Sequence, residues 1–552
     1  MVSPEGGPKD TTPPSVTGSD PANFSTGFTG KNIHIEFDEF INAETSGDKV
    51  LVSPPLADVP DYRLRGKGLV ITFEDTLLSN VTYTIDFGNA IADITEGNKL
   101  AGYRYIFSTG AYLDSMALSG KVADAFNNQP AKSALVQLYP PHSDTIPSDS
   151  IPVLLKPRYV TRTKDDGTFA FTHISPGRYL IIALIDKSGD MLFNMPGEQV
   201  AFLDSLVTPW YEKPVVADTA SADTLEADTS YYVTPAPVPS PLSLRIFEPK
   251  DSTQILDRSD ILRDNMAQLV FRYPPSNLRI VPLNADSLAE WSLLERGTTG
   301  DTLTLWLLPG LPDTVILKVS ADRMLNDTIE LSRLFREPPK KGKKQESEVV
   351  KRLEVRDNIR GGLFNFLKGP LLLTTSYPLA KTDLSGLRII DGKDTLQPEA
   401  AVVDSIRRKI AVRYRWTEGK PYLLFLPDSA LMSLNGLAND TLRLRFKTAE
   451  ARVYGNLKIN VEVPEGTPQL IVQLMTEKEK VVEERTVKET GRISFDYILP
   501  ANYKLKAILD RNSNGRWDSG DYFRKIQPEL VVYFPRTLEL RANWDIEETW
   551  KP

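Results

Sequence analysis

The chain has 552 residues, no cysteine, three histidines and a formal net charge of −8 at pH 7. The lack of cysteine excludes disulfides, thiolate nucleophiles and cysteine-ligated metals, and the acidic balance argues against nucleic acid as the main partner. The length predicts three to five domains, and no apolar run approaches the roughly 18 residues that a membrane-spanning helix needs.

The chain opens with a segment rich in proline, glycine and threonine, over residues 1–17. Its composition predicts a flexible, extended tether. It carries no apolar core of the kind that signal peptides have. Either the protein is cytosolic or the numbering begins after processing.

Short segments in which apolar and polar residues alternate dominate the rest of the chain. Residues 33–37 (IHIEF), 302–306 (TLTLW) and 442–446 (LRLRF) are examples. Alternation places apolar side chains on one face of a strand and polar ones on the other. Turn residues separate these segments at short intervals, which is typical of β-sandwiches.

Two stretches have the composition of linkers. Residues 209–241 are acidic and then proline-rich, which predicts an extended or loosely packed segment. Residues 337–352 form a basic and then mixed-charge run. Its lysines either contact acidic lipid or protein, or belong to a solvated loop between two domains.

An internal duplication is the most informative pattern of the sequence. The spacing from Gly167 to Pro176 equals the spacing from Gly491 to Pro500. The spacing from Gly167 to Asp186 likewise equals the spacing from Gly491 to Asp510. Upstream, ALVQLY (134–139) matches LIVQLM (470–475), and the segment around Gly120 matches the segment around Gly455. This spacing maintains a strand, a turn and a further strand, so it serves a folded core and requires no catalysis.

The preceding region repeats as well, because Tyr83 and Phe107 have the same separation as Tyr422 and Phe446. A two-domain unit therefore occurs twice, near residues 18–208 and 353–552. The sequence predicts an all-β chain of about five tandem β-sandwich domains. The expected segments are a tether 1–17, a domain 18–112, a domain 113–208, a linker 209–241, a domain 242–336, a linker 337–352, a domain 353–449 and a domain 450–552.

Residues 66–112 resemble the SbsA-type bacterial Ig-like domain, mainly through YTIDFG (83–88), DITEGN (93–98) and FSTG (107–110). The segments after Gly120 and Gly455 resemble carboxypeptidase-regulatory-like or Cna-B-like sandwiches, which have a transthyretin-like topology. The chain as a whole resembles Ig-like-domain-containing outer-membrane lipoproteins of Bacteroidota.

The resemblance implies a lipid anchor at the processed N-terminus and a place at the outer membrane, on the cell surface or the periplasmic face. It implies a non-enzymatic role as a structural scaffold or as an accessory subunit of an outer-membrane complex with β-barrel subunits. Such complexes assemble proteins or take up nutrients. The alternative is a cell-surface adhesin or glycan-binding protein.

The loop that begins at Asp510 carries the sharpest chemical motif, D-x-[DN]-x-[DN]-G. Ca²⁺ prefers about six to eight oxygen ligands, so the motif predicts a structural calcium site. Position 12 is aspartate where the motif has glutamate, and the flanking sequences are strand-like. The alternative is a polar turn that orders itself through its own side chains. The candidate ligands are Asp510, Asn512, Asn514, Arg516 (through its carbonyl), Asp518 and Asp521.

The remaining polar clusters favour structural roles. Residues 93–98 form an acidic turn that is either a weak ligand site or a connection between strands. Alternation places Glu36 and Asp38 on a solvent face, which argues against a paired-carboxylate hydrolase. The sequence has no P-loop, no G-x-S-x-G elbow and no H-E-x-x-H, so no enzymatic activity is expected.

Tryptophans near the C-terminal end could stack on sugars or dock a partner. The alternative is that they cover the ends of a sandwich, which is their commoner use. These residues are Trp517, Trp544 and Trp550.

Overall fold

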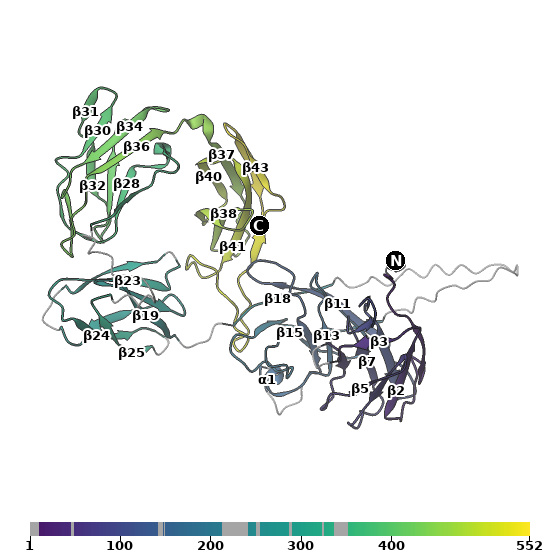
Figure 1. The fold of residues 1–552 in the computed structure, drawn as a ribbon. Helices are drawn as coiled ribbons and strands as arrows, with labels where there is room; N and C mark the ends of the chain where they lie inside the picture. Colours follow the sequence, from purple (N-terminus) through teal and green to yellow (C-terminus); the bar gives the residue numbers. More distant parts are fainter. Residues whose placement is uncertain are drawn as a thin grey trace, which may run out of the picture. The chain divides into compact units, whose positions relative to one another are not determined.

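The computed structural model describes residues 10–45, 49–141, 147, 149–211, 241–249, 254–285, 290–297, 299–322, 325–335 and 352–552. The first half of the expected tether, most of the linker 209–241 and the linker 337–352 except its last residue lie outside these ranges. Nearly all of the regular secondary structure among the described residues is β-strand, which confirms the predicted all-β class (Figure 1). None of their helices is long and apolar enough to cross a membrane.

The described residues group into two compact units. The first contains the residues up to 250 together with Thr467–Ile471 and Ile508–Val532, and the second contains the remainder from 251 onward. A segment close to the C-terminus therefore packs with the N-terminal part of the chain.

The first sandwich has sheets in the orders β1-β2-β6-β5, β10-β7-β4 and β3-β8-β9. Its strands are β1 (Val16–Asp20), β2 (Asn32–Phe37), β3 (Ile41–Ala43), β4 (Leu51–Ser53), β5 (Asp61–Arg65), β6 (Gly68–Thr72), β7 (Thr82–Asp86), β8 (Ile91–Asp93), β9 (Lys99–Leu100) and β10 (Arg104–Ser108).

The second sandwich has sheets β14-β11-β17 and β13-β12-β15-β16, with β18 also paired to β11. Its elements are β11 (Met116–Asp124), β12 (Leu135–Tyr139), α1 (Ile151–Leu154), β13 (Tyr159–Arg162), β14 (Thr168–Ile174), β15 (Leu180–Ile185), β16 (Gln199–Phe202), β17 (Trp210–Tyr211) and β18 (Leu242–Ile246).

The third sandwich has sheets β19-β20-β23-β22 and β21-β24-β25. Its strands are β19 (Leu256–Arg263), β20 (Met266–Phe271), β21 (Arg279–Pro282), β22 (Ser292–Arg296), β23 (Thr302–Leu307), β24 (Thr314–Ser320) and β25 (Asn326–Ser332).

The fourth sandwich has sheets β26-β28-β33-β32, β27-β36-β34-β30-β31 and β29-β35. Its elements are β26 (Val355–Asp357), β27 (Leu363–Phe364), the 3₁₀ turn η1 (Phe366–Lys368), β28 (Leu371–Thr375), β29 (Leu379–Thr382), β30 (Arg388–Asp391), β31 (Asp394–Leu396), β32 (Glu399–Val402), β33 (Lys409–Arg413), β34 (Pro421–Leu426), β35 (Leu431–Ser433) and β36 (Leu442–Thr448).

The fifth sandwich has sheets β40-β37-β44 and β39-β38-β41-β42, with β43 paired to β41. Its elements are the 3₁₀ turn η2 (Ala451–Val453), β37 (Gly455–Val461), β38 (Gln469–Thr476), β39 (Val481–Val487), β40 (Gly491–Ile498), β41 (Ala501–Asp510), β42 (Val531–Tyr533), β43 (Leu538–Leu540) and β44 (Asp545–Trp550).

The predicted alternation sets which side chains enter the cores. In β2, Ile33, Ile35 and Phe37 are buried, whereas Glu36 between them is exposed. Each sandwich buries such residues between its sheets, and this apolar burial is the main favourable term in its folding. Asp38, beyond the end of β2, is exposed as predicted.

The repeat of the first sandwich in the fourth is visible in the strand register. Phe107 lies directly opposite Tyr83 on the neighbouring strand, and Phe446 lies directly opposite Tyr422. The two rings are stacked in both cases, with centroids 5.4 Å and 6.1 Å apart. The equal sequence spacing therefore reflects one cross-strand aromatic pair, used twice.

The repeat of the second and fifth sandwiches needs one correction. Phe171 lies opposite Leu118, and Phe495 lies opposite Leu457. Leu457 is therefore the counterpart of Leu118, which makes Met116 the counterpart of Gly455. The expected match of Gly120 to Gly455 is wrong, because Gly120 lies four residues after Met116. An even shift keeps every side chain on its predicted face, and alternation alone cannot detect it.

The expected start of the middle domain at residue 242 is also wrong. β18 pairs in parallel with β11, just as β44 pairs in parallel with β37. β17 pairs with the same strand β11. The strands that flank the undescribed residues 212–240 therefore both lie in the second sandwich, where the start of the next domain was expected.

Candidate functional site

The loop after β41 and its counterpart after β15 share one turn. Asp186 at the end of β15 accepts N–H bonds from Gly189 and Met191, at 2.7 and 2.8 Å. Asp510 accepts them from Asn514 and Gly515, at 3.1 and 2.8 Å. In both loops the leading aspartate satisfies backbone donors, which is how an Asx turn orders itself.

The backbone conformation of the two turns repeats too. Gly189 and Ser513, each three residues after the leading aspartate, have φ of 79° and 56°. Met191 and Gly515, two residues further on, have φ of 65° and 78°. Residues other than glycine rarely adopt this region, so the shared geometry indicates that the hydrogen bonds determine the turn.

A buried glutamate completes each loop, and sequence reasoning missed both. Glu198 accepts the backbone N–H of Lys187 at 3.2 Å, and Glu529 accepts that of Arg511 at 2.8 Å. Lys187 and Arg511 each directly follow the leading aspartate. The second oxygen of Glu529 accepts the N–H of Asp518 at 3.0 Å. Because the loops differ in length, equal spacing could not reveal this pair.

The surroundings of Glu529 shift its titration. The residue is 4% exposed. Burial raises the pKa of its carboxyl group above the ordinary value, and the carboxylates of Asp510 and Asp518 act in the same direction. The backbone N–H groups of Arg511 and Asp518 oppose that shift.

The six predicted calcium ligands are arranged around hydrogen bonds of the loop itself. The side-chain amides of Asn512 and Asn514 both donate to Asp518 Oδ2, at 2.6 and 2.5 Å. Asp521 accepts the N–H of Arg524 at 3.1 Å, and Arg516 Nε lies 3.9 Å from Asp518 Oδ1.

Within the described ranges, no group of three or more histidine, aspartate or glutamate side chains is placed to hold a metal ion. Side-chain oxygens of five of the six predicted ligands accept hydrogen bonds from donors of the protein: Asp510, Asn512, Asn514, Asp518 and Asp521. Calcium at this loop stays a prediction.

The loop in the C-terminal repeat is longer than its counterpart, and the added residues pack on the second sandwich. We call residues 516–527 the docking loop. Tyr522 is fully buried, with its ring edge-on to Phe193 and Phe202 at centroid distances of 5.8 and 5.3 Å. The ring centroids of Trp517 and Phe126 lie 5.0 Å apart. Tyr522 therefore belongs to the hydrophobic core that β15, β16 and α1 build.

Polar contacts fix the docking loop and its flank at both ends. Ser519 Oγ donates to the carbonyl of Glu248 at 2.5 Å, and Gln527 donates to the carbonyl of Phe202 at 3.1 Å. Asn128 donates to the carbonyl of Val531 at 3.0 Å. These bonds join the loop to the second sandwich. Because hydrogen bonds are directional, they fix the orientation of the loop more closely than apolar contact alone would.

Gly520 marks the closest approach of the docking loop. A Cβ at this position would lie 2.5 Å from the ring of Phe247 and 2.7 Å from the carbonyl oxygen of Ile526. Glycine is therefore required for this contact, because any side chain would collide with a buried ring and with backbone.

The three tryptophans have different environments. Trp517 is half-buried and donates from its indole nitrogen to the carbonyl of Glu529 at 2.9 Å. Trp550 is buried in the core of the fifth sandwich. Trp544 is 49% exposed, with the guanidinium of Arg541 4.9 Å from its ring centroid. Of the three, Trp544 alone is exposed to solvent.

The acidic turn 93–98 is also internally satisfied. The Asp93 carboxylate accepts N–H bonds from Glu96, Gly97 and Asn98, at 2.6 to 2.9 Å. Burial raises the pKa of Asp93, but these donors outweigh that effect and hold it below its ordinary value. The side chain of Asn98 donates to the carbonyls of Asp10 and Thr12, so the turn holds the start of the described chain.

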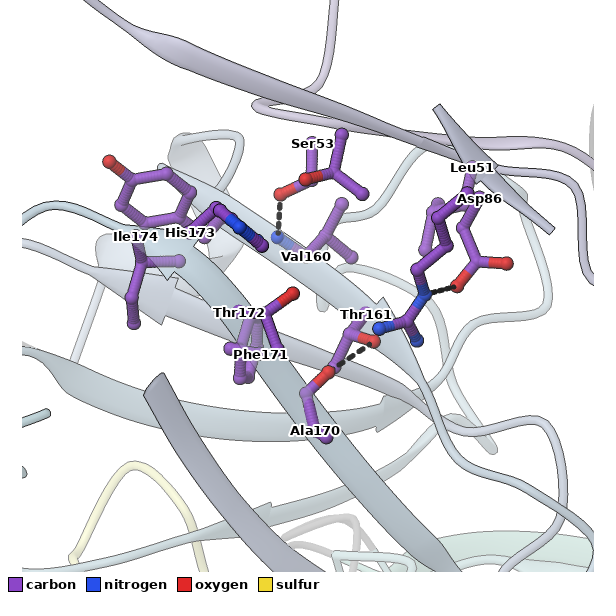
Figure 2. A pocket seen from close by; sticks show the side chains of 13 residues that line it. Leu51, Ser53, Asp86, Val160, Thr161, Ala170, Phe171, Thr172, His173 and Ile174 are labelled. Carbon is purple, nitrogen blue, oxygen red and sulfur yellow. Dashed lines mark hydrogen bonds and ion pairs between the residues drawn. The ribbon is translucent and has the colours of Figure 1, made fainter. Parts of the chain in front are cut away.

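A small pocket lies where the first and second sandwiches meet (Figure 2). The N–H of Val160 donates to Ser53 Oγ at 3.0 Å, and Arg104 Nε lies 2.7 Å from Asp86 Oδ2. The pocket encloses a cavity of about 20 Å³, which has room for about one water molecule. The pocket is therefore part of a packed junction, too small for an organic ligand.

Comparison with protein families identifies the N-terminal region. Residues 10–109 match the family described as the bacterial Ig-like domain. These residues form a bacterial Ig-like domain. The match covers the first sandwich, including the aromatic pair of Tyr83 and Phe107, and it confirms this part of the resemblance noted in the sequence. No curated protein matches the chain.

The chain aligns at low identity with several solved structures, and three bacterial examples follow. The Bacillus anthracis TIE protein is 10% identical, with 99% of this chain and 75% of that chain covered, at a TM-score of 0.14. BcpA, the major pilin subunit of Bacillus cereus, is 9% identical, with coverage of 79% and 98% and a TM-score of 0.14. SGBP-B of the Bacteroides ovatus mixed-linkage glucan utilization locus, solved with a heptasaccharide, is 9% identical, with coverage of 76% and 93% and a TM-score of 0.20.

Proposed function

We propose that the protein is a non-enzymatic lipoprotein of the outer membrane that acts as a structural scaffold or as an accessory subunit of an outer-membrane complex. The docking loop is the observation that carries this proposal. A buried tyrosine and several side-chain hydrogen bonds to the second sandwich hold a segment from near the C-terminus within the N-terminal unit. Such a connection fastens distant parts of the chain to one another, which is what a scaffold requires.

The polar loops support a structural role. The carboxylates of Asp93, Asp186, Asp510 and Glu529 all accept backbone N–H bonds of their own or neighbouring turns. A general acid or base must instead reach a proton of the substrate. These side chains are used to order loops, so their motifs serve the fold.

The proposed partners are β-barrel subunits of a protein-assembly or nutrient-uptake complex, with a lipid anchor at the processed N-terminus. The test is chemical cross-linking of the protein in native membranes, followed by mass spectrometry of the captured chains. The proposal expects outer-membrane β-barrel proteins among them and recovery of the protein with the outer-membrane fraction. Recovery as a free monomer in the soluble fraction would contradict it.

A glycan-binding or adhesive function is the second candidate, and Trp544 favours it. A half-exposed indole beside a guanidinium group offers both an apolar face and hydrogen-bond donors to a sugar ring. A glycan array with the protein and its Trp544→Ala variant tests this function. Binding that the variant loses would support it, and an array without signal for either protein would reject it.

A further inference from the structure

A larger cleft lies within the first compact unit, where the first and second sandwiches meet. Residues between 50 and 62 line one side, and the other side is lined by Lys132, Ser133, Leu135, Lys156, Arg162, Ile185, Asp186, Gly189, Asp190 and Met191. We call it the junction cleft. Its volume of about 720 Å³ lies within the usual range for sites that bind small organic molecules.

The apolar part of the lining is aliphatic. Leu56 and Val59 contribute from the first sandwich, and Leu135 and Met191 contribute from the second. Val59 is 67% exposed, so its side chain is accessible from solvent. Tyr62 is the one aromatic residue of the described lining, so the cleft offers little of the ring surface on which sugars stack.

Three cations line the same cleft: Lys132, Lys156 and Arg162. Lys156 donates to the carbonyl of Leu56 at 3.2 Å. Among the described residues, none of these three cations lies in an ion pair with an aspartate or glutamate. A half-buried arginine without an acidic partner is available to an anion from solution.

Lys132 and Arg162 emerge from the same end of one strand pair. Arg162, the last residue of β13, lies directly opposite Leu135, the first residue of β12. The N–H of Ser133 donates to the carbonyl of Thr163 at 3.3 Å, which holds the residues just before β12 beside the residues just after β13. The two cations are therefore neighbours at one side of the cleft.

The lining also contains three aspartates, and two of them are already used. Asp186 accepts N–H bonds from Gly189 and Met191, as described above. Asp190 accepts the N–H of Leu192 and the side-chain amide of Asn194, at 2.8 and 2.7 Å. Both carboxylates keep their charge, but their oxygens are held by loop donors, and among the described residues no ion pair joins them to the three cations of the cleft.

We propose that the junction cleft binds an amphipathic organic anion, whose aliphatic chain lies against Leu56, Val59, Leu135 and Met191 and whose anionic head pairs with Lys132 and Arg162. The head is a carboxylate or a phosphate, since both accept hydrogen bonds from a guanidinium group. The aliphatic lining favours an alkyl or acyl chain over a sugar.

Calorimetric titration of the full chain with decanoate and with decyl phosphate tests the proposal. We expect saturable binding of at least one of them, and the better of the two identifies the head group. The double variant Lys132→Gln/Arg162→Gln should weaken that binding roughly tenfold or more, since both charged donors to the anionic head are removed. Circular dichroism verifies that the variant is folded.

Two controls make the result specific. Lys121→Gln removes an exposed lysine on β11 outside the cleft and should leave the affinity unchanged. Decyl glucoside has the same chain and a neutral head, and should bind at least about tenfold more weakly. Equal binding of the neutral compound, an unaffected double variant, or no binding of either anion would overturn the proposal.

Discussion

The ring of Tyr522 lies edge-on to the ring of Phe202, with centroids 5.3 Å apart and an interplanar angle of 87°. Phe202 ends strand β16 of the second sandwich, and Tyr522 comes from the docking loop near the other end of the chain. Both rings are almost fully buried. This edge-to-face pair joins residues that no local sequence pattern connects, and it anchors the docking loop.

Tyr522→Ala should release the docking loop. Removal of a large buried ring costs about 3–5 kcal/mol when the cavity cannot close. We expect a lower midpoint of urea unfolding and much faster proteolysis within residues 510–529. Phe523→Ala, at the neighbouring 56% exposed position, should cost less than about 1 kcal/mol. Equal losses of stability in the two variants would show that the burial of Tyr522 does not stabilise the docking loop.

Gly520→Ala tests the close approach to Phe247. The added methyl group would collide with a buried ring and with the carbonyl of Ile526, so the loop must shift at a cost of about 1–3 kcal/mol. Gly18→Ala is the matched control, since nothing lies within 4 Å of a Cβ placed there. The midpoint of thermal unfolding should be clearly lower for Gly520→Ala than for Gly18→Ala. A Gly520→Ala variant as stable as the parent would show that the loop does not approach Phe247 this closely.

Glu529 should make stability depend on pH. Its pKa in the folded protein is raised above the ordinary value of 4.5, so the folded state holds this proton more tightly than the unfolded chain. Its contribution to stability is therefore largest below pH 4.5 and is lost as the pH rises through the folded pKa.

The variant Glu529→Gln cannot titrate at this position. Urea unfolding of both proteins from about pH 4 to about pH 7 isolates the effect, because the other groups cancel in the difference. We expect the stability of the parent relative to the variant to decrease as the pH rises. A difference that is constant, or that changes in the opposite sense, would show that burial does not dominate the environment of Glu529.

Calcium and the hydrogen-bonded turn make opposite predictions for the loop at Asp510. A bound ion would stabilise the folded state by mass action. Asp510 and Asp518 already accept hydrogen bonds from the protein, so the self-ordered turn predicts that about 1 mM Ca²⁺, enough to fill weak extracellular sites, moves the melting temperature by less than about 1 °C. A rise of several degrees that Asp518→Asn abolishes would establish the metal site instead.

The sequence was sufficient for the features that depend on local alternation. The burial of Ile33, Ile35 and Phe37, and the twofold use of the pair formed by Tyr83 and Phe107, follow from period-two patterning and equal spacing. The match of Gly120 to Gly455 failed because a shift by four residues preserves the same faces.

Features that depend on contacts between distant segments could not be predicted. β18 shows nothing in its own sequence that assigns it to β11 across the segment 209–241. Glu529 follows a loop of different length from that before Glu198, so their common role becomes visible only through the hydrogen bonds to Arg511 and Lys187. Trp517 and Tyr522 gave no signal that their partners lie in the second sandwich.

The central claim is that the docking loop packs on the second sandwich, and a cysteine pair tests it most directly. The chain has no native cysteine, and Gln527 Nε2 lies 3.2 Å from Asp204 Oδ1. In Asp204→Cys/Gln527→Cys, a short bismaleimide should link the two positions within one chain at high dilution, as peptide mass spectrometry would detect. Arg63→Cys/Gln527→Cys, with one cysteine on β5 of the first sandwich, should give little intrachain product. Equal yields from the two pairs, or no intrachain link between positions 204 and 527, would contradict the account.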